Sequence, residues 1–256
     1  MEQIFDSHAH YDDEAFDEDR YNLLSALPKK GVCGVVNNAV DVLSARKCIT
    51  LARSFPFVYA AVGVHPHEAG KAKEEDFQQL RDMLLDEPKA VAVGEIGLDY
   101  HYDFSKRPVQ REVFERQLRL ARELSMPVII HDREAHGDTM ELLSRYHPQG
   151  VVHCFSGSVE MAREVVKLGM YIGLGGAVTF KNARHPLEVA AGIPLDRLLL
   201  ETDAPYMSPV PYRGKRCDST MITFTAMKIA EARGISQHEV FEAASDNARR
   251  LFGISK

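Results

Sequence analysis

The chain has 256 residues, of which 45% are hydrophobic and 27% are charged, and its formal net charge is −6. This composition is typical of a globular protein and excludes fibrous and intrinsically disordered classes. The acidic balance argues against a broad basic surface that follows long nucleic acid, although it is compatible with a local phosphate pocket. One large domain is possible at this length, because α/β barrels commonly reach this size as one unit.

The N-terminal residues do not combine a basic segment with an apolar stretch, so we expect no secretory signal. No apolar run reaches the length of about 20 residues that a membrane-spanning helix needs. We therefore expect a cytoplasmic protein with no membrane contact, and nothing in the sequence indicates an obligate protein partner. The four cysteines show no CxxC spacing, which favours reduced thiols over disulfides or a cysteine zinc site; they are Cys33, Cys48, Cys154 and Cys217.

Eight short apolar segments recur along the chain, and their continuous apolar character suits strands buried on both faces. In chain order they lie at 3–8, 31–39, 57–64, 90–97, 127–131, 150–155, 169–176 and 197–203. Amphipathic stretches with helical spacing separate them, for example at 108–125, 159–169 and 218–234. This alternation predicts an α/β fold, a single (β/α)8 TIM-type barrel domain over residues 1–256, with a doubly wound open sheet as the alternative.

In such a barrel the catalytic groups come from the C-terminal ends of different strands. Side chains that bind divalent metals follow five of the eight predicted strands, namely His8 with His10, Glu95, His131, His153 and Asp203. His8 and His10 are two residues apart, so in an extended segment both rings point to the same side. Any single histidine is more often a packed or surface residue, but the shared placement of all six side chains indicates a metal centre.

Four histidines and two carboxylates are too few for two closed sites, unless one carboxylate bridges two ions. A bridged pair leaves coordination positions open, and open positions are typical of catalytic rather than structural sites. Two ions about 3.5–4 Å apart activate water and stabilise the attacking and leaving oxygens of a displacement. The residues alone therefore predict metal-assisted hydrolysis.

Several segments resemble the TatD family of metal-dependent hydrolases, which is related to the wider group of amidohydrolase-type barrels. The matching segments are DSHAHYDD at 6–13, AVGVHPHEA at 61–69, GEIGLDYH at 94–101, PVIIHDREA at 127–135, HCFSGS at 153–158, ETDAPY at 201–206, RGKR at 213–216 and NARRLF at 247–252. The order and spacing of these segments along the chain identify the family far more specifically than any single segment does.

The resemblance implies two divalent ions per chain, with Mg, Mn, Zn or Ni as the candidates. One ion would be held by His8, His10, Glu95 and Asp203. The other would be held by the bridging Glu95 together with His131 and His153. Asp203 would also orient the attacking water or receive its proton, because a carboxylate beside a cation stays ionised.

Two histidines and one carboxylate near the predicted mouth each have two interpretations. His65 and His67 would reach a substrate phosphate or contact a metal ligand, or they would stabilise the loop around Pro66. Asp99 would orient a histidine ligand or cap the following turn.

Three aromatic residues would stack on a base or simply pack, namely Tyr100, Phe155 and Tyr206.

Cations and one cysteine in the loops bear on substrate binding. Arg133, Arg213 and Lys215 supply the guanidinium and ammonium groups with which a barrel binds phosphate, or they are solvated loop charges. Cys217 departs from the family pattern, which generally has Asn at this position, and a thiol does not replace the donors and acceptor of an amide. This departure affects the expected loop conformation or the substrate contacts at that position, and it leaves the metal ligands unchanged.

The resemblance implies a divalent-metal-dependent hydrolase of phosphodiester bonds, a TatD-type deoxyribonuclease with 3′-5′ exonuclease-like action on single-stranded DNA ends. The acidic chain favours such an end or a short oligonucleotide over an extended duplex. One alternative is an amidohydrolase or lactonase, because the same barrel activates water against a carbonyl carbon; the loop cations disfavour it. Another is a non-catalytic metal-dependent nucleotide-binding protein, which the full ligand set disfavours.

Overall fold

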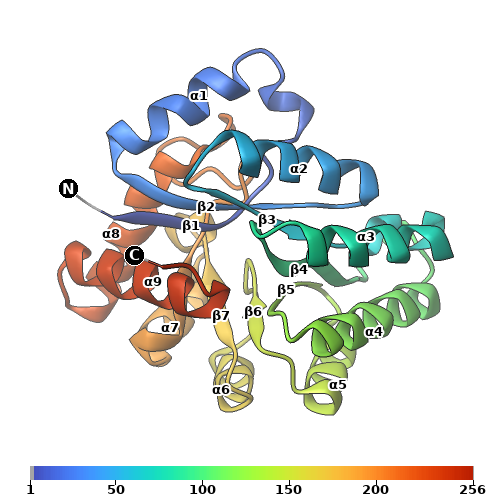
Figure 1. Cartoon of the computed structure of the whole chain (residues 1–256). Coiled ribbons are helices and arrows are strands. Elements are labelled where there is room, and N and C mark those ends of the chain that lie inside the picture. Colours follow the sequence, from blue (N-terminus) through green and yellow to red (C-terminus); the bar gives the residue numbers. More distant parts are fainter. Residues whose placement is uncertain (1–2, 256) are drawn as a thin grey trace.

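The computed structural model describes residues 3–255, and its core is one sheet of eight parallel strands in sequence order (Figure 1). The strands are β1 (Ile4–Ala9), β2 (Val32–Asn38), β3 (Val58–Val62), β4 (Ala90–Asp99), β5 (Val128–Arg133), β6 (Gly150–Val152), β7 (Tyr171–Leu174) and β8 (Leu198–Leu200). Each of the eight predicted strand positions is confirmed.

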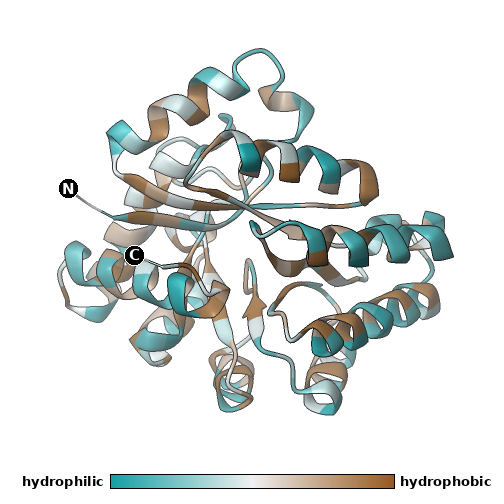
Figure 2. Ribbon diagram, viewed as in Figure 1, coloured by the Kyte–Doolittle hydropathy of each residue, from teal (hydrophilic) through white to brown (hydrophobic). Residues whose placement is uncertain are grey.

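Helices alternate with the strands and surround the sheet. They are α1 (Arg20–Ala26), α2 (Val42–Ser54), α3 (Glu74–Asp86), α4 (Arg107–Leu124), α5 (His136–Tyr146), α6 (Val159–Lys167), α7 (Arg184–Gly192), α8 (Ile222–Arg233) and α9 (Gln237–Phe252). Figure 2 shows hydrophobic residues on the strands and on the helix faces that cover them, with hydrophilic residues outside. No helix of the described residues is both long enough and apolar enough to cross a bilayer.

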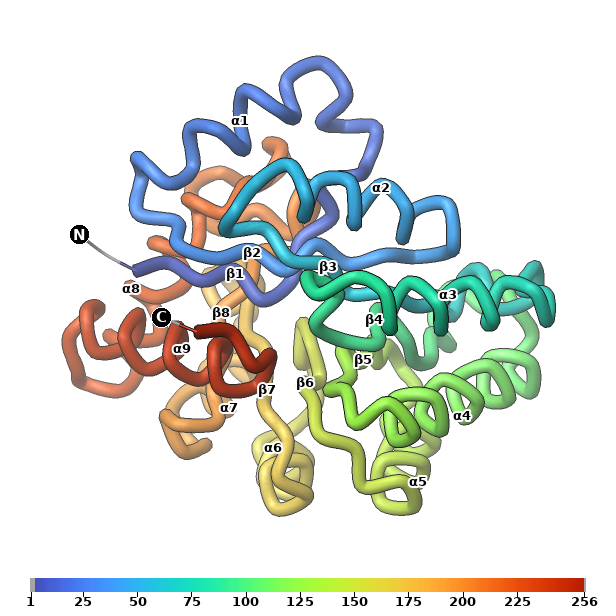
Figure 3. Tube along the Cα trace, viewed as in Figure 1, coloured from blue at the N-terminus to red at the C-terminus, as the bar shows by residue number. Residues whose placement is uncertain are grey.

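Backbone hydrogen bonds between β1 and the segment after β8 bring the two ends of the sheet together. Asp203 N donates to His8 O at 2.9 Å, and His10 N donates to Ala204 O at 2.7 Å. Figure 3 follows the chain once around the barrel, so that the first strands and α9 lie side by side. A doubly wound sheet would reverse its strand order near the middle, and this sheet does not. The barrel prediction is confirmed and the open-sheet alternative is wrong.

The interior of the barrel is filled by one side-chain layer to which every strand contributes. The layer consists of Phe5, Val36, Ala61, Val91, Ala92, Ile129, Val151, Tyr171 and Leu199. Helix α9 adds Ala248 and Phe252 to it, and the Phe252 ring stacks on Phe5 with centroids 6.5 Å apart. The barrel is therefore a packed core rather than a pore.

The strand boundaries differ from prediction in ways that matter for the site. Strands β6 and β8 are shorter than expected, so His153 and Asp203 lie in the loops that follow them. Glu95 lies inside β4, where the pairing with β5 shifts register between Val93 and Ile96. Such irregularities redirect side chains, and apolar periodicity does not reveal them.

Candidate metal centre

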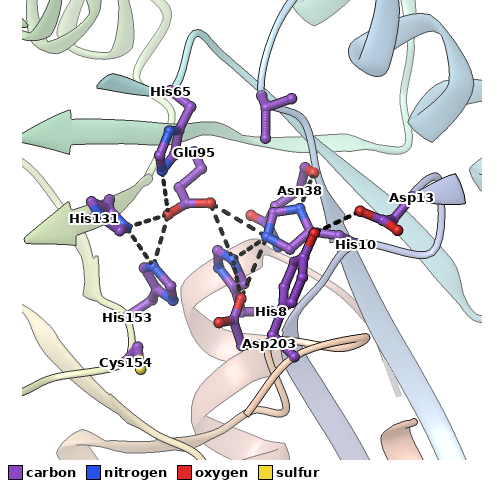
Figure 4. A network of polar contacts seen from close by, with 12 residues as sticks. His8, His10, Asp13, Asn38, His65, Glu95, His131, His153, Cys154 and Asp203 are labelled. Atoms are coloured by element: carbon purple, nitrogen blue, oxygen red, sulfur yellow. Dashed lines mark hydrogen bonds and ion pairs between the residues drawn. The ribbon is translucent and has the colours of Figure 1, made fainter. Parts of the chain in front are cut away.

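The six predicted ligands converge at the mouth of the barrel around the carboxylate of Glu95 (Figure 4). Glu95 is 2% exposed, and its two oxygens have different neighbours. Oε1 lies 2.8 Å from both His131 Nδ1 and His153 Nε2. Oε2 lies 3.3 Å from His8 Nε2 and 3.4 Å from His10 Nε2. One carboxylate thus faces two separate pairs of imidazoles.

Asp203 lies on the far side of the His8 and His10 pair. Its Oδ1 is 3.7 Å from His8 Nε2 and 3.5 Å from His10 Nε2, and the two Nε2 atoms are 3.0 Å apart. Asp203 has a φ of 63°, in the left-handed region that few non-glycine residues adopt. The HxH pair converges as expected from its spacing, and Asp203 completes that side of the cluster.

The ligand atoms are close enough for metal ions to link them. Three overlapping groups have candidate ligand atoms within 4.8 Å of one another, and they are His8, His10 and Glu95; His8, His153 and Asp203; and His65, Glu95 and His131. Imidazole nitrogens and carboxylate oxygens are a donor set that suits Zn, Mn, Ni and Fe. The residues therefore fit divalent metals.

Two candidate ligands have partners that fix the orientation of their rings. His131 Nε2 lies 3.0 Å from Asp99 Oδ2, which leaves Nδ1 directed at Glu95. His10 Nδ1 lies 2.9 Å from the carbonyl oxygen of Asn38, which leaves Nε2 directed at the cluster. Such partners select the ring tautomer and raise ligand basicity.

Asp99 does both of the things expected from the sequence. Its Oδ2 contacts His131 as described above and also lies 3.0 Å from His67 Nε2. Its Oδ1 accepts hydrogen bonds from the backbone N–H groups of His101 at 3.0 Å and Tyr102 at 2.9 Å. One buried carboxylate therefore orients a candidate ligand and caps the turn after β4.

The side chains of the cluster have pKa values that are shifted in different directions. Burial opposes ionisation of Glu95, but the surrounding histidines outweigh it and hold its pKa well below the usual range. Burial likewise opposes protonation of His131, but hydrogen bonds to Asp99 and Glu95 raise its pKa to about 9. Burial dominates for His8 and lowers its pKa to about 3. The cluster thus holds protons where metal ions would otherwise supply positive charge.

The two histidines of the GVHPH segment lie in different surroundings. His65 is buried, with Nε2 3.5 Å from Glu95 Oε1, and burial lowers its pKa to about 4. It therefore contacts the candidate ligand Glu95, which is one of the roles expected from the sequence. It also lies close enough to be a candidate ligand itself, which sequence reasoning did not predict although His65 follows a strand as the others do. His67 lies further out and contacts Asp99.

Two buried carboxylates behind the cluster were also missed. Asp6 accepts hydrogen bonds from Thr202 Oγ1 at 2.6 Å and Ser219 Oγ at 2.7 Å, and burial raises its pKa to about 6. Glu201 accepts from Cys154 N, and burial raises its pKa to about 8. Each carboxylate precedes a candidate ligand by two residues, and that spacing is the signal which could have identified them.

The three predicted loop cations have no carboxylate partners among the described residues. Arg133 lies over the Tyr102 ring at 4.7 Å and Arg213 over the Phe180 ring at 3.7 Å. Within the described residues Arg133, Arg213 and Lys215 form no ion pair, so their charges are available to a ligand. Cys217 is buried and its N–H donates to Pro205 O at 2.9 Å.

The three aromatic residues divide between packing and exposure. Phe155 is buried, which favours packing. Tyr100 is half-buried, and its hydroxyl donates to Asp138 Oδ2 at 2.5 Å. Tyr206 is exposed, and its hydroxyl donates to Asp13 Oδ2 at 2.7 Å. Of the three, Tyr206 alone presents a largely exposed ring at the mouth.

A (β/α)8 barrel with a cluster of histidines and carboxylates at the C-terminal ends of its strands is the architecture of metal-dependent barrel hydrolases. The sequence matches the TatD related DNase family over residues 5–253. The chain belongs to this family, which confirms the resemblance seen in its motifs.

Relatives and solved structures agree with this membership. A Bacillus subtilis (strain 168) protein named as the metal-dependent hydrolase YabD is 40% identical, covering 98% of this chain and 100% of its own. A Cronobacter sakazakii protein named 3′-5′ ssDNA/RNA exonuclease TatD is 35% identical, covering 97% of each chain. The crystal structure of YJJV, a TatD homolog from Escherichia coli K12, superposes with a TM-score of 0.93 at 33% identity over 98% of each chain.

Proposed function

We propose that the chain binds two divalent ions bridged by Glu95 and hydrolyses phosphodiester bonds at single-stranded DNA ends, with 3′-5′ exonuclease-like polarity. The observation that carries the proposal is the Glu95 carboxylate, whose two oxygens face different pairs of histidines. Relatives named 3′-5′ ssDNA/RNA exonuclease support the choice of nucleic acid.

His8, His10, Glu95 and Asp203 would hold one ion. Glu95, His131 and His153 would hold the other, with His65 beside them at 3.5 Å from Glu95 Oε1. When bound, two ions of this kind polarise the phosphodiester and lower the pKa of the attacking water.

Side chains of this protein would accept the proton of the attacking water and neutralise the substrate phosphates. Asp203 would accept the proton of the attacking water, since its carboxylate lies at the mouth and the facing His10 and His8 lower its pKa despite burial. Arg133, Arg213 and Lys215 would neutralise the phosphates of the bound strand, because no carboxylate competes for them among the described residues.

The test uses metal-stripped protein to which Mg, Mn, Zn or Ni is restored, with end-labelled single-stranded DNA, RNA and a panel of lactones as substrates. We expect metal-dependent loss of nucleotides from the 3′ end of the DNA. Loss of an acid–base group typically costs about 10²–10⁴-fold, so Asp203→Asn should be slower by that factor. This variant also controls for contaminating nuclease.

The outcomes separate the candidate functions. Equal degradation of DNA by wild type and Asp203→Asn, with lactone opening by wild type alone, would make the chain a lactonase. Metal-dependent nucleotide binding without turnover of any substrate would make it a binding protein. Faster cleavage of RNA than of DNA would retain phosphodiester hydrolysis and correct the substrate.

A further inference from the structure

The loop between β4 and α4 exposes two aromatic rings beside the metal centre. Tyr102 is 48% exposed and Phe104 is 69% exposed. Their ring centroids are 5.2 Å apart at an interplanar angle of 13°, so the rings are stacked on each other. We call this pair the aromatic platform. Adjacent exposed apolar side chains that polar residues surround are typical of surfaces where ligands bind.

Hydrogen bonds to buried groups fix the backbone of this loop. Asp99 Oδ1 accepts from Tyr102 N at 2.9 Å. Ser105 Oγ donates to His67 O at 3.0 Å, and Gln110 Nε2 donates to Ser105 O at 2.7 Å. Ser105 and Gln110 are both buried. The platform is therefore pre-organised, and a ligand does not have to order it on binding.

The ring of His67 lies between the platform and the candidate metal ligand His131. The His67 ring lies edge-on to Phe104 at 4.8 Å and to Tyr102 at 5.5 Å between centroids. His67 and His131 contact the same oxygen of Asp99, each at 3.0 Å. A nucleotide whose phosphate lies at the metal centre thus has a stacking surface for its base nearby.

Charge on the platform also fits a nucleotide. The Arg133 guanidinium lies 4.7 Å from the centre of the Tyr102 ring, and within the described residues it forms no ion pair. It is therefore free to bind a phosphate while it covers one side of the platform.

We infer that Tyr102 and Phe104 form a base-stacking subsite for the nucleotide next to the scissile phosphate, with Arg133 holding an adjacent phosphate. The inference rests on the proposed function, since it takes single-stranded nucleic acid as the substrate. Stacking on aromatic rings accepts every base, and it needs an unpaired base. The subsite therefore selects single strands without selecting sequence.

The test combines substrates that lack one base with variants that lack one ring. Single-stranded DNA carries an abasic unit at the first, second or third nucleotide from the 3′ end. Phe104→Leu and Tyr102→Leu remove the ring face and keep apolar bulk. Leu85→Ala is the matched control, because Leu85 is 61% exposed on α3 and lies outside the platform.

At one of the three positions we expect the abasic unit to raise the KM of the wild type by about 5- to 150-fold, the range for base–aromatic stacking. Phe104→Leu should raise the KM of the complete substrate by a similar factor and leave the KM of that abasic substrate unchanged. Leu85→Ala should match the wild type on both. A variant that slows both substrates equally would overturn the subsite and leave the proposed function standing.

A binding experiment tests the subsite without cleavage. DNA with 2-aminopurine at the same position is titrated with metal-loaded Asp203→Asn protein, and its fluorescence should be quenched by stacking. Adding Phe104→Leu to this background should remove most of the quenching. Quenching that requires Phe104, together with a wild-type protein that cleaves no oligonucleotide, would retain the subsite and overturn the proposed function. Quenching that is unchanged by Phe104→Leu would overturn the subsite.

Discussion

At the scale of single residues, Glu95 explains most of the cluster. Its carboxylate is buried, yet its pKa is held well below the usual range because histidines approach both oxygens. An ordinary ion pair would engage one side of a buried carboxylate. Contacts of 2.8 Å on Oε1 and 3.3–3.4 Å on Oε2 engage both sides, which is the arrangement that a bridging ligand needs.

Glu95→Gln tests this bridging role. An amide keeps one acceptor oxygen and replaces the other with a donor, so it serves one side of the cluster only. We expect the metal content to fall from two ions to at most one per chain and activity to fall more than about 100-fold. Metal content by mass spectrometry measures the first and hydrolysis of labelled DNA the second. Glu242→Gln, on the exposed face of α9, is the control, and two tightly bound ions in Glu95→Gln would contradict the bridge.

Asp99→Asn tests the orientation of His131. The amide oxygen of Asn still accepts the hydrogen bonds of the turn after β4. The amide nitrogen then replaces the anionic oxygen that contacts His131. Loss of such a partner typically costs 10- to 100-fold in metal affinity or activity. Competitive metal titration measures the affinity. Asp103→Asn removes an exposed carboxylate of the same loop and should change it by less than twofold; equal effects of the two variants would refute the orienting role.

At the scale of elements, periodicity predicts where the strands lie but not how they end. Continuous apolar runs mark all eight strands because both faces of a barrel strand are buried. The HxH spacing predicts the convergence of His8 and His10, and the alternation of strands and helices brings the distant ligands to one mouth. The register shift around Glu95 and the left-handed backbone of Asp203 depend on tertiary contacts, which periodicity does not encode.

The aromatic platform shows the same limit for loops. From their place near the predicted mouth, Tyr100, Phe155 and Tyr206 are expected either to stack on a base or to pack, whereas the exposed stacked pair is Tyr102 and Phe104. The exposure of a loop side chain depends on hydrogen bonds such as that from Ser105 Oγ to His67 O, which joins residues 38 positions apart. The buried carboxylate of Glu201 is hidden for a related reason, since its partner Cys154 lies in the loop after β6, 47 residues away.

Phe252→Ala tests whether α9 stabilises the barrel independently of the site. The Phe252 ring is buried against Phe5 in the interior layer, and a Phe→Ala change in a core costs about 3–5 kcal/mol. The urea midpoint at constant slope measures the free energy of unfolding. Met227→Ala on α8 is the exposed control and should stay within about 0.5 kcal/mol. Activity per folded molecule should not change; a selective loss of activity with unchanged stability would contradict this role for α9.

At the scale of the whole molecule, bound metal ions would link segments from several sides of the barrel. The candidate ligands come from β1, β4 and β5 and from the loops after β1, β6 and β8, so ions at the centre would link segments that are far apart in sequence. A metal ion that binds only the folded state stabilises that state by about 2.7 kcal/mol when its concentration is 100 times its Kd. Metal ions should therefore raise the stability of the entire fold.

Proton release measures this coupling directly. Hydrogen bonds outweigh burial and raise the pKa of His131 to about 9, and carboxylates raise the pKa of His153 and His10 as well. Near pH 7 the His131 ring is therefore protonated in the metal-free protein, whereas a ring must be neutral to bind metal. Metal binding should release protons, and affinity should rise from pH 6 until about pH 9, where His131 loses its proton unaided.

Calorimetry of metal binding in two buffers with different ionisation enthalpies counts the released protons. The apparent binding enthalpy should differ between the buffers at pH 7, and the difference should decrease as the pH rises past about 9. The same linkage fixes the sign for folding without metal. The raised pKa of His131 stabilises the folded state fully below its unfolded value near 6.5, and this contribution is lost as the pH rises through about 9. Bound metal should offset that loss of stability, because the ion replaces the proton on His131. A metal affinity that stays constant from pH 6 to pH 9 would mean that protons do not occupy the metal positions.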